Sequence, residues 1–327
     1  MKKTEEKKLI VGIGSALVDI LVYEDDDFVQ RLNVEKGGMT LVDKEFIEQT
    51  LSQVKGKQRV VPGGSACNTI IGIGQIGGMA RFVGKRGEDE FGIIFETDLK
   101  KNNVEPSLLT STSYTGRVLS IITPDAQRSM FTFLGASADM LPEDVSNRYF
   151  EDAAIVYVEG YLLFNKDLIL KALSTAKESG ALIALDLASF TVVEESREIL
   201  DKIVSDYVDI LIANEDEARA FTGYSDERKG IEALSKDVDI AVLKVGEKGS
   251  YIARHGKIIR VEPKGSGKAL DTTGAGDLWA SGFLFGLVNG YPLEKCGEFG
   301  SACGYEVCQV VGANIPEDGW KRIKRIL

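Results

Sequence analysis

The chain has 327 residues, and its 39 Lys and Arg against 50 Asp and Glu give a formal net charge of −11. This negative charge disfavours binding to nucleic acids or to acidic membrane surfaces. The single histidine, His255, lies in a polar segment, which disfavours Ser-His-Asp hydrolysis and histidine-rich zinc sites. By contrast, 35 glycines allow many close backbone approaches. We therefore expect chemistry that uses carboxylates and backbone amides.

The cysteines and the N-terminus bear on the cellular compartment. The four cysteines form no Cys-x-x-Cys pair and are too few to cross-link a chain of this length, which favours reduced thiols in the cytoplasm. The charged start and the apolar run after it resemble a signal peptide. However, Glu5 and Glu6 dilute the positive charge and Asp19 ends the apolar run, so a first buried strand is the preferred interpretation. No run reaches the about 18 apolar residues that span a bilayer.

The N-terminal part of the chain mixes regular elements with two unusual segments. The regular elements are a strand at 9–16, a Gly-Gly turn at 60–65 that enters a helix, and a strand at 80–84. The segments at about 17–43 and 112–136 do not fit a strand-helix alternation. The second has two β-rich arms joined by Pro-Asp-Ala-Gln, a sequence typical of type I turns. We predict that both segments form a small antiparallel sheet that acts as a lid on the main sheet.

From about residue 150 onward, short apolar runs alternate with amphipathic segments. We expect strands at 153–160, 181–187, 208–214 and 239–246, and helices at 166–179, 192–205, 226–236, 275–289, 293–311 and 316–327. Strands that are apolar throughout and separated by helices are typical of a parallel sheet covered on both faces. The sequence therefore predicts a single α/β domain over residues 1–327, with three α/β/α layers and a mostly parallel central sheet.

Two glycine patterns suggest dinucleotide binding, but neither fits it. Gly72, Gly74 and Gly77 match G-x-G-x-x-G, yet they end a predicted helix, whereas the mechanism needs them between a strand and the start of a helix. Gly12 and Gly14 follow a strand but lack the third glycine. There is also no G-x-x-x-x-G-K-S/T loop. A dinucleotide-dependent oxidoreductase is therefore disfavoured.

A stronger motif, DTTGAGD at 271–277, precedes the apolar helix predicted at 275–289. The amides of Gly274, Ala275 and Gly276 would lie at the positive end of this helix, where they can stabilise charge that develops on a phosphoryl group. Asp277 can take a proton from an attacking hydroxyl. An Asp in a first helical turn is also simply a favourable partner of the helix dipole. The two threonines, the second Asp and the apolar helix favour the functional interpretation.

The segments PGGSACN (62–68) and DTTGAGDLWASGF (271–283) resemble the two signatures of the ribokinase-like, phosphofructokinase-B family of carbohydrate and nucleoside kinases. Segments at 208–217, 243–250 and 312–316 also resemble family segments, in the same order. The resemblance covers essentially the whole chain. It implies a ribokinase-like fold with a lid, and phosphoryl transfer that uses ATP and Mg²⁺.

The resemblance also assigns residues to the nucleotide side. It implies that Asp277 is the catalytic base and that the amides of 274–277 form an anion hole. Asn214 and Glu217 match the family's N-x-x-E motif, which positions Mg²⁺ and phosphates through water, although the same spacing forms a helix capping box. Further residues implied here are Lys244, Gly246, Gly249 and Gly312 for ATP, and Asp271 and Thr273, with the 308–313 segment, for a monovalent cation such as K⁺.

On the acceptor side, the resemblance implies that Asp19, after Gly14 and Ser15, holds two sugar hydroxyls. A carboxylate that accepts from a vicinal diol selects its geometry. Gly63, Gly64 and Asn68 match the family's sugar-contacting Gly-Gly turn and Asn, and Arg128 resembles an arginine that closes over the phosphates. Each has a structural alternative: Asp19 as a turn former, Asn68 as a polar helix residue, and Arg128 as an exposed charge on an edge strand.

Within the family, the chain is most similar to the adenosine kinase branch, so adenosine or a related nucleoside is the expected acceptor. Met39 and Leu162 depart from that pattern at positions that would touch a base, the second of them usually aromatic. Met39, Leu41, Tyr161 and Phe164 could line an apolar pocket or belong to the core. The alternatives are a kinase for ribose, fructose or a keto-sugar acid, and a non-catalytic nucleoside or sugar sensor. We expect a monomer or homodimer that binds only ATP and the acceptor.

Overall fold

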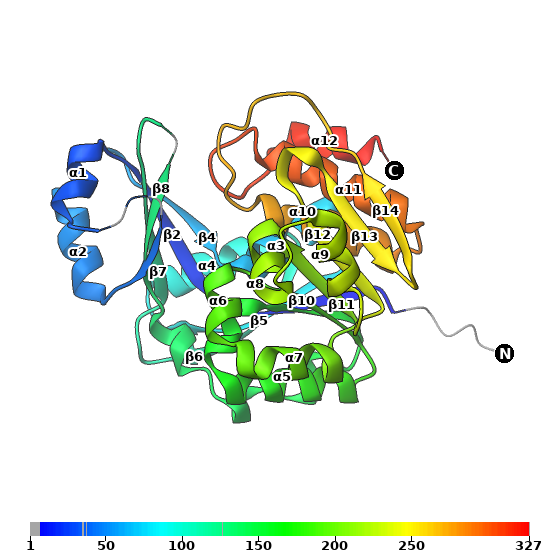
Figure 1. The fold of residues 1–327 in the computed structure, drawn as a ribbon. Helices are drawn as coiled ribbons and strands as arrows, with labels where there is room; N and C mark the ends of the chain where they lie inside the picture. Colours follow the sequence, from blue (N-terminus) through cyan, green and yellow to red (C-terminus); the bar gives the residue numbers. More distant parts are fainter. Residues whose placement is uncertain (1–6, 35, 37, 126, 327) are drawn as a thin grey trace.

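The computed structural model describes residues 7–34, 36, 38–125 and 127–326. Within these ranges the chain forms a nine-stranded sheet and a separate five-stranded sheet, which lies to one side of the first (Figure 1). Residues 1–6, Glu35, Gly37, Ala126 and Leu327 lie outside the described residues. The charged N-terminal start, part of the predicted lid segments and the last residue of the helix predicted at 316–327 are therefore not addressed by the structure.

The nine-stranded sheet is parallel except for β13, and its strand order is β14-β13-β12-β11-β10-β9-β1-β5-β6. The strands are β1 (Leu9–Ile13), β5 (Ala80–Gly87), β6 (Val104–Ser111), β9 (Ala153–Glu159), β10 (Leu182–Asp186), β11 (Ile210–Asn214), β12 (Ile240–Lys244), β13 (Ser250–Arg254) and β14 (Lys257–Val261). Side chains alternate between two hydrophobic clusters: in β9, Val156 and Val158 belong to one and Ile155 and Tyr157 to the other. The sheet is therefore buried on both faces, as the apolar runs predict.

Helices cover both faces of this sheet and complete the three layers. Those on one face are α5 (Lys166–Glu178), α6 (Phe190–Glu195), α7 (Arg197–Tyr207), α8 (Glu215–Thr222) and α9 (Glu227–Leu234). Those on the other are α3 (Ser65–Ile76), α4 (Glu90–Lys101), α10 (Ala275–Val288) and α11 (Leu293–Val307), with α12 (Glu317–Lys324) packed against α10 and α11. Single 3₁₀ turns lie at Gly135–Asp139, Pro142–Asp144, Asn147–Tyr149, Gly160–Phe164 and Gly246–Lys248. The α/β/α fold class is confirmed.

The five-stranded sheet differs from the expected antiparallel one. Its order is β3-β8-β7-β2-β4, with strands β2 (Leu17–Tyr23), β3 (Met39–Leu41), β4 (Arg59–Gly63), β7 (Gly116–Ile122) and β8 (Arg128–Phe133). β7 and β8 form the expected antiparallel hairpin, but β2 runs parallel to β7 and β3 parallel to β8. β1 and β6 are parallel strands of the main sheet, and β2 follows the carboxyl end of β1 as β7 follows that of β6. Both segments therefore start from the same side of the main sheet, and β2 and β7 run parallel. The prediction of an antiparallel sheet was therefore correct for β7 with β8 and for β2 with β4, and wrong for the two parallel pairs.

The small sheet also uses more of the chain than expected. One of its faces is covered by α1 (Asp26–Arg31) and α2 (Lys44–Gln53), which pack Phe28, Val29 and Ile47 against its strands. Figure 1 places both helices on its outer side, away from the main sheet. The segment 44–63, which supplies α2 and β4, was not among the segments assigned to this sheet from the sequence.

Three smaller expectations can be compared with the structure. The single helix expected at 192–205 is two helices, α6 and α7, separated at Ser196. His255 lies in the turn between β13 and β14 and is mostly exposed, as its polar surroundings indicate. In the described part of the chain, no helix is both long and apolar enough to cross a membrane.

Candidate active site

A pocket of about 1130 Å³ lies between the two sheets, and residues of both line it. The residues singled out from the sequence that line it are Ser15, Asp19, Met39, Gly64, Asn68, Arg128, Asn214, Glu217, Lys244, Asp271, Thr273, Gly274, Ala275, Gly276 and Asp277. The fold thus brings together positions that are more than 250 residues apart in the chain.

Four glycines assigned to the site lie outside this lining. Gly63 packs behind Asp19, and the amide of Gly312 donates to the Asp271 carboxylate at 2.8 Å. Gly246 and Gly249 lie in the turn between β12 and β13. Gly63 and Gly312 therefore support residues of the pocket from behind. Approach of ATP to Gly246, Gly249 and Gly312 stays a prediction.

A row of polar side chains ends four neighbouring parallel strands: Glu159 on β9, Asp186 on β10, Asn214 on β11 and Lys244 on β12. All four line the pocket. Ligands of open α/β sheets bind at this carboxyl edge of the strands. Glu159 and Asp186 were not among the residues predicted from the sequence, because each strand was considered as an apolar run without regard to its last, polar residue. A signal was present, since the segments VYVE, LIALD, ILIAN and IAVLK each change from apolar to polar at the last residue.

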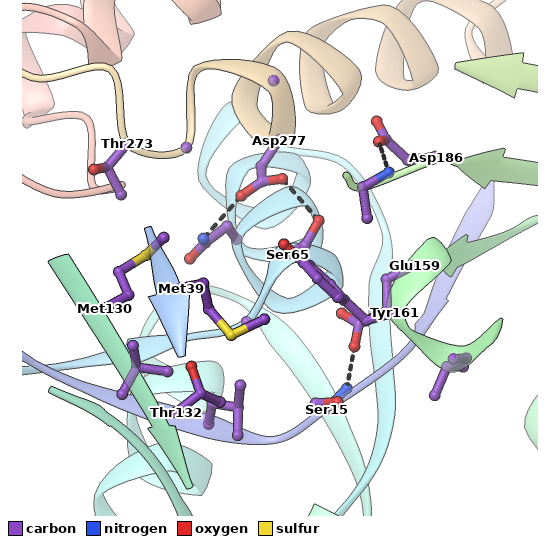
Figure 2. A pocket seen from close by; sticks show the side chains of 18 of the residues that line it. Ser15, Met39, Ser65, Met130, Thr132, Glu159, Tyr161, Asp186, Thr273 and Asp277 are labelled. Carbon is purple, nitrogen blue, oxygen red and sulfur yellow. Dashed lines mark hydrogen bonds between the residues drawn. The ribbon is translucent and has the colours of Figure 1, made fainter. Parts of the chain in front are cut away.

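Asp277 lies in the first turn of α10 and is held by α3. Its two carboxylate oxygens accept hydrogen bonds from Ser65 Oγ at 2.8 Å and from Asn68 Nδ2 at 2.9 Å (Figure 2). Ser65 was not among the predicted residues, and the Asn68 amide contacts the proposed base. Gly274, which precedes the helix, has a φ of 72° and leaves no room for a Cβ beside Ala313. This backbone conformation favours glycine and sets the direction in which the first amides of α10 point.

Asp277 and Asp19 are among the pocket carboxylates whose pKa values are raised. Burial raises the pKa of Asp277 to about 6, with a further upward contribution from the charge of Asp186, against the hydrogen bonds of Asn68 and Ser65. Burial also raises the pKa of Asp19 to about 7, while Arg128 opposes the shift. A carboxyl group with a pKa near neutrality can both accept and release a proton, as a general base must.

Asp19 on β2 is positioned by the neighbouring strand β4. A Cβ on Gly63 would lie 2.3 Å from Asp19 Oδ1, so only glycine at this position leaves room for the carboxylate. The two residues are near neighbours across the antiparallel pair of β2 and β4. The Gly-Gly turn thus has a steric role in the pocket.

Replacing Gly63 by Ala is expected to push the Asp19 carboxylate out of place. Overpacking of this kind costs about 1–3 kcal/mol, and the acceptor KM should rise while the ATP KM changes little. Steady-state kinetics and thermal unfolding measure the two effects. Gly56→Ala is the matched control, because its Cβ would meet nothing closer than 3.6 Å, and it should behave as wild type. Equal acceptor KM values for Gly63→Ala and Gly56→Ala would contradict the positioning role of Gly63.

Asn214 and Glu217 form the capping box that the sequence offered as an alternative. Asn214 Oδ1 accepts from the Glu217 amide at 2.9 Å, and the Glu217 carboxylate accepts from the Asn214 amide at 2.8 Å and from Asn214 Nδ2 at 2.6 Å. Burial and the charge of Asp186 raise the pKa of Glu217. Over the described residues, no group of three or more His, Cys, Asp or Glu could hold a metal ion. A Mg²⁺ ion here would therefore need phosphate oxygens or water as its main ligands.

Arg128 joins the small sheet to the DTTGAGD segment. Its Nη2 lies 2.9 Å from Asp271 Oδ2, and both side chains are about nine-tenths buried. Asp271 also accepts from the Gly312 amide, the Thr273 amide and Thr273 Oγ1. Four donors thus occupy the Asp271 carboxylate. A monovalent cation at Asp271 and Thr273 stays a prediction, and it would need other oxygen ligands, such as backbone carbonyls.

Glu159 fastens the connection from β1 to β2. It is 1% exposed, and its carboxylate accepts from the amides of Ser15 at 2.7 Å and Ala66 at 2.9 Å. Figure 2 shows it between Ser15 and the start of α3. Glu159 therefore holds together Ser15, where the chain first enters the small sheet, and Ala66, where it leaves after β4.

Part of the pocket lining, here called the apolar wall, consists of five large apolar side chains. Met39 on β3 pairs with Met130 on β8 (Figure 2), and Leu41, Tyr161 and Phe164 also line the pocket. Met39, Leu41 and Phe164 are 41%, 59% and 50% exposed, and exposed apolar side chains that line one pocket are typical of a ligand-binding surface. Two of the three belong to the small sheet. They are available to contact a ligand and are not part of a closed core.

The family model described as pfkB family carbohydrate kinase matches residues 34–319. The chain belongs to this family. The resemblance stated from the two signatures is thereby confirmed. As a pfkB family member the chain is a kinase that transfers a phosphoryl group to a hydroxyl of a sugar or nucleoside, and kinases of this family use ATP. Membership agrees with the kinase prediction and disagrees with an oxidoreductase.

Individual relatives of this pfkB family kinase carry names for different acceptors. A 5-dehydro-2-deoxygluconokinase of Bacillus licheniformis is 28% identical over 315 residues, which cover 91% of this chain and 89% of that protein. A probable sugar kinase from Rhizobium etli CFN 42 is 31% identical with a TM-score of 0.91, covering 98% and 100% of the two chains. An adenosine kinase from Sinorhizobium meliloti is 33% identical with a TM-score of 0.89, covering 98% and 99%.

Proposed function

We propose that the chain transfers the γ-phosphoryl group of ATP to a primary hydroxyl of a ribose-containing nucleoside, with adenosine or a close analogue as the leading acceptor. The observation that carries this proposal is that the pocket lining combines two kinds of side chain. Polar groups that can bind hydroxyls, Asp19 and Ser15 among them, line it together with the apolar side chains of Met39, Met130 and Phe164. A nucleoside likewise combines a polar ribose with a flat, largely apolar base.

The proposed mechanism uses this chain's residues in separate roles. Asp19 accepts hydrogen bonds from the ribose diol and so directs the primary hydroxyl toward Asp277. Asp277 takes the hydroxyl proton as the oxygen attacks the γ-phosphorus, and the amides of 274–277 bind the oxygens of the phosphoryl group. Mg²⁺, held by the phosphates and through water by Glu217, would neutralise phosphate charge. The small sheet acts as a lid that excludes water, and Arg128 contributes positive charge from it.

A sugar acceptor is the second candidate, and a specific observation favours it. Curated relatives carry the names of sugar kinases. Two of them are the 5-dehydro-2-deoxygluconokinase of Bacillus licheniformis described above and that of Bacillus subtilis, which is 29% identical over 255 residues. A free sugar would contact only the polar part of the pocket lining, such as Asp19 and Ser15. The apolar wall would then contact water, which is unfavourable for exposed side chains of this size.

An acceptor panel tests the choice. We expect ADP release with Mg²⁺-ATP and adenosine, weaker release with other nucleosides, and little with ribose, fructose or 5-dehydro-2-deoxygluconate. Asp277→Asn run in parallel separates phosphoryl transfer from contaminating ATPase. A kcat/KM for any free sugar above that for every nucleoside would replace the first candidate by the second. Tight acceptor binding without turnover would indicate a sensor.

A further inference from the structure

Lys244 and Asp186 form a buried ion pair that the proposed mechanism has not yet used. Lys244 Nζ lies 2.9 Å from Asp186 Oδ2, and the two side chains are 13% and 5% exposed. β11 lies between their strands, so the pair spans it at the carboxyl edge of the sheet. The other Asp186 oxygen accepts from the Ala188 amide at 3.0 Å. Asp186 is therefore fixed by its own backbone turn and in turn fixes the Lys244 ammonium.

The ammonium points at the first turn of α10. A Cβ built on Gly276 would lie 3.0 Å from Lys244 Nζ, so the positive charge lies directly against the backbone whose amides form the proposed anion hole. Both residues line the pocket. A larger side chain at 276 would come between the ammonium and the space above the helix. Glycine at position 276 therefore lets the Lys244 ammonium and the amides at the start of α10 face the same part of the pocket.

The charge balance of the pocket gives the ammonium a further purpose. Seven carboxylates line the pocket and repel the phosphates of ATP: Asp19, Glu159, Asp167, Asp186, Glu217, Asp271 and Asp277. Against them stand Lys36, Arg128, Lys166 and Lys244. Arg128, on the small sheet, is paired with Asp271 ahead of α10, whereas Lys244 lies against Gly276 in the first turn of α10. The carboxylates around Lys244 raise its pKa, so it is charged at neutral pH.

Resting on the proposed function, we propose that Lys244 is a catalytic residue that stabilises the phosphoryl group during transfer, and that Asp186 is the residue that positions it. As the acceptor oxygen bonds to the γ-phosphorus, its proton goes to Asp277, and the bond from phosphorus to the β-phosphate oxygen breaks with its electron pair leaving on ADP. Lys244 neither gains nor loses a proton. Its charge acts on the non-bridging oxygens held by the amides of 274–277.

Three variants separate this role from a structural one. Lys244→Met should lower kcat by about 10²- to 10³-fold, but it also leaves Asp186 buried without a partner, which destabilises the fold. The double variant Lys244→Met, Asp186→Asn removes that unpaired charge, so its thermal stability should recover while kcat stays low. Asp186→Asn alone keeps the ammonium but loosens it, and should lower kcat more than it changes the ATP KM. Recovery of kcat together with stability in the double variant would overturn the proposal.

Lys85→Met is the matched control. Lys85 has the same 13% exposure and an ion pair of 2.8 Å with Asp144, and neither side chain lines the pocket. It should lose stability but keep its kcat. A second measurement does not depend on the acceptor: ADP with aluminium fluoride mimics the phosphoryl group in transfer. Lys244→Met should bind ADP as wild type does but lose the tightening that aluminium fluoride gives. Equal tightening in both proteins would overturn the role of Lys244 even if the acceptor is a sugar.

Discussion

Replacing Asp277 by Asn is expected to lower kcat by about 10²- to 10⁴-fold, with ATP binding nearly unchanged. Asn keeps the size of the side chain and can still accept a hydrogen bond from Ser65, but it cannot take a proton from the acceptor hydroxyl. Steady-state turnover and ATP titration by calorimetry measure the two quantities. A variant with wild-type turnover would remove Asp277 from the role of base.

The pH profile gives an independent check on the same residue. A base works in its ionised form, so kcat/KM should fall as the pH falls through the pKa of Asp277, about 6. Asp19, with a pKa of about 7, must also be ionised to accept from the diol. The acid limb of kcat/KM for the acceptor should therefore be steeper than one proton allows. In Asp19→Asn it should become a one-proton limb. A profile that stays flat from pH 7.5 to below 5 would contradict both assignments, since the acid limb expected here is at about pH 6–7.

Replacing Asp19 by Ala should raise the KM for the acceptor and leave the KM for ATP nearly unchanged. Two hydrogen bonds to a charged group are worth about 1.5–3 kcal/mol each, so the acceptor KM should rise by about 10²- to 10⁴-fold. The lower end is expected, because loss of the carboxylate also removes its unfavourable burial. Kinetics with each substrate varied in turn measure the effect.

Asp209→Ala is a suitable control for Asp19→Ala. Asp209 is likewise an aspartate next to a strand, where its carboxylate accepts a hydrogen bond from the Ile183 amide, but it lies outside the pocket lining. It should leave both KM values near those of wild type. Equal increases of the acceptor and ATP KM values in Asp19→Ala would remove Asp19 from the acceptor site.

The main sheet could be predicted from the sequence because it is buried on both faces. Strands such as β9 and β11 are apolar at every position up to the last, and the helices between them keep a regular spacing. The small sheet was harder to predict. β3 has only three residues, all exposed, and β2 pairs with a strand about 100 residues away, so no local pattern fixes the direction of either.

The site residues divide in the same way. Asp277 and Asn214 stand in motifs that are contiguous in the chain, and the sequence found them. Ser65 and Asp186 act on partners 212 and 58 residues away, across the fold. The hydrogen bonds between Asn214 and Glu217 form a capping box, which confirms the alternative interpretation of this pair. A role of the same pair toward Mg²⁺ stays a prediction.

The division of labour between the two sheets bears on how such a kinase can change its substrate. Asp19, Met39 and Met130 belong to the small sheet, whereas Asp277, Lys244 and Asn214 belong to the main sheet and its helices. Substitutions at the apolar wall can alter which molecule is accepted without disturbing the groups proposed to carry out the transfer. A new acceptor preference can thus evolve, or be engineered, through a few exchanges at Met39, Leu41 and Met130, provided that Arg128 on β8, which is proposed to act on the phosphates, is kept.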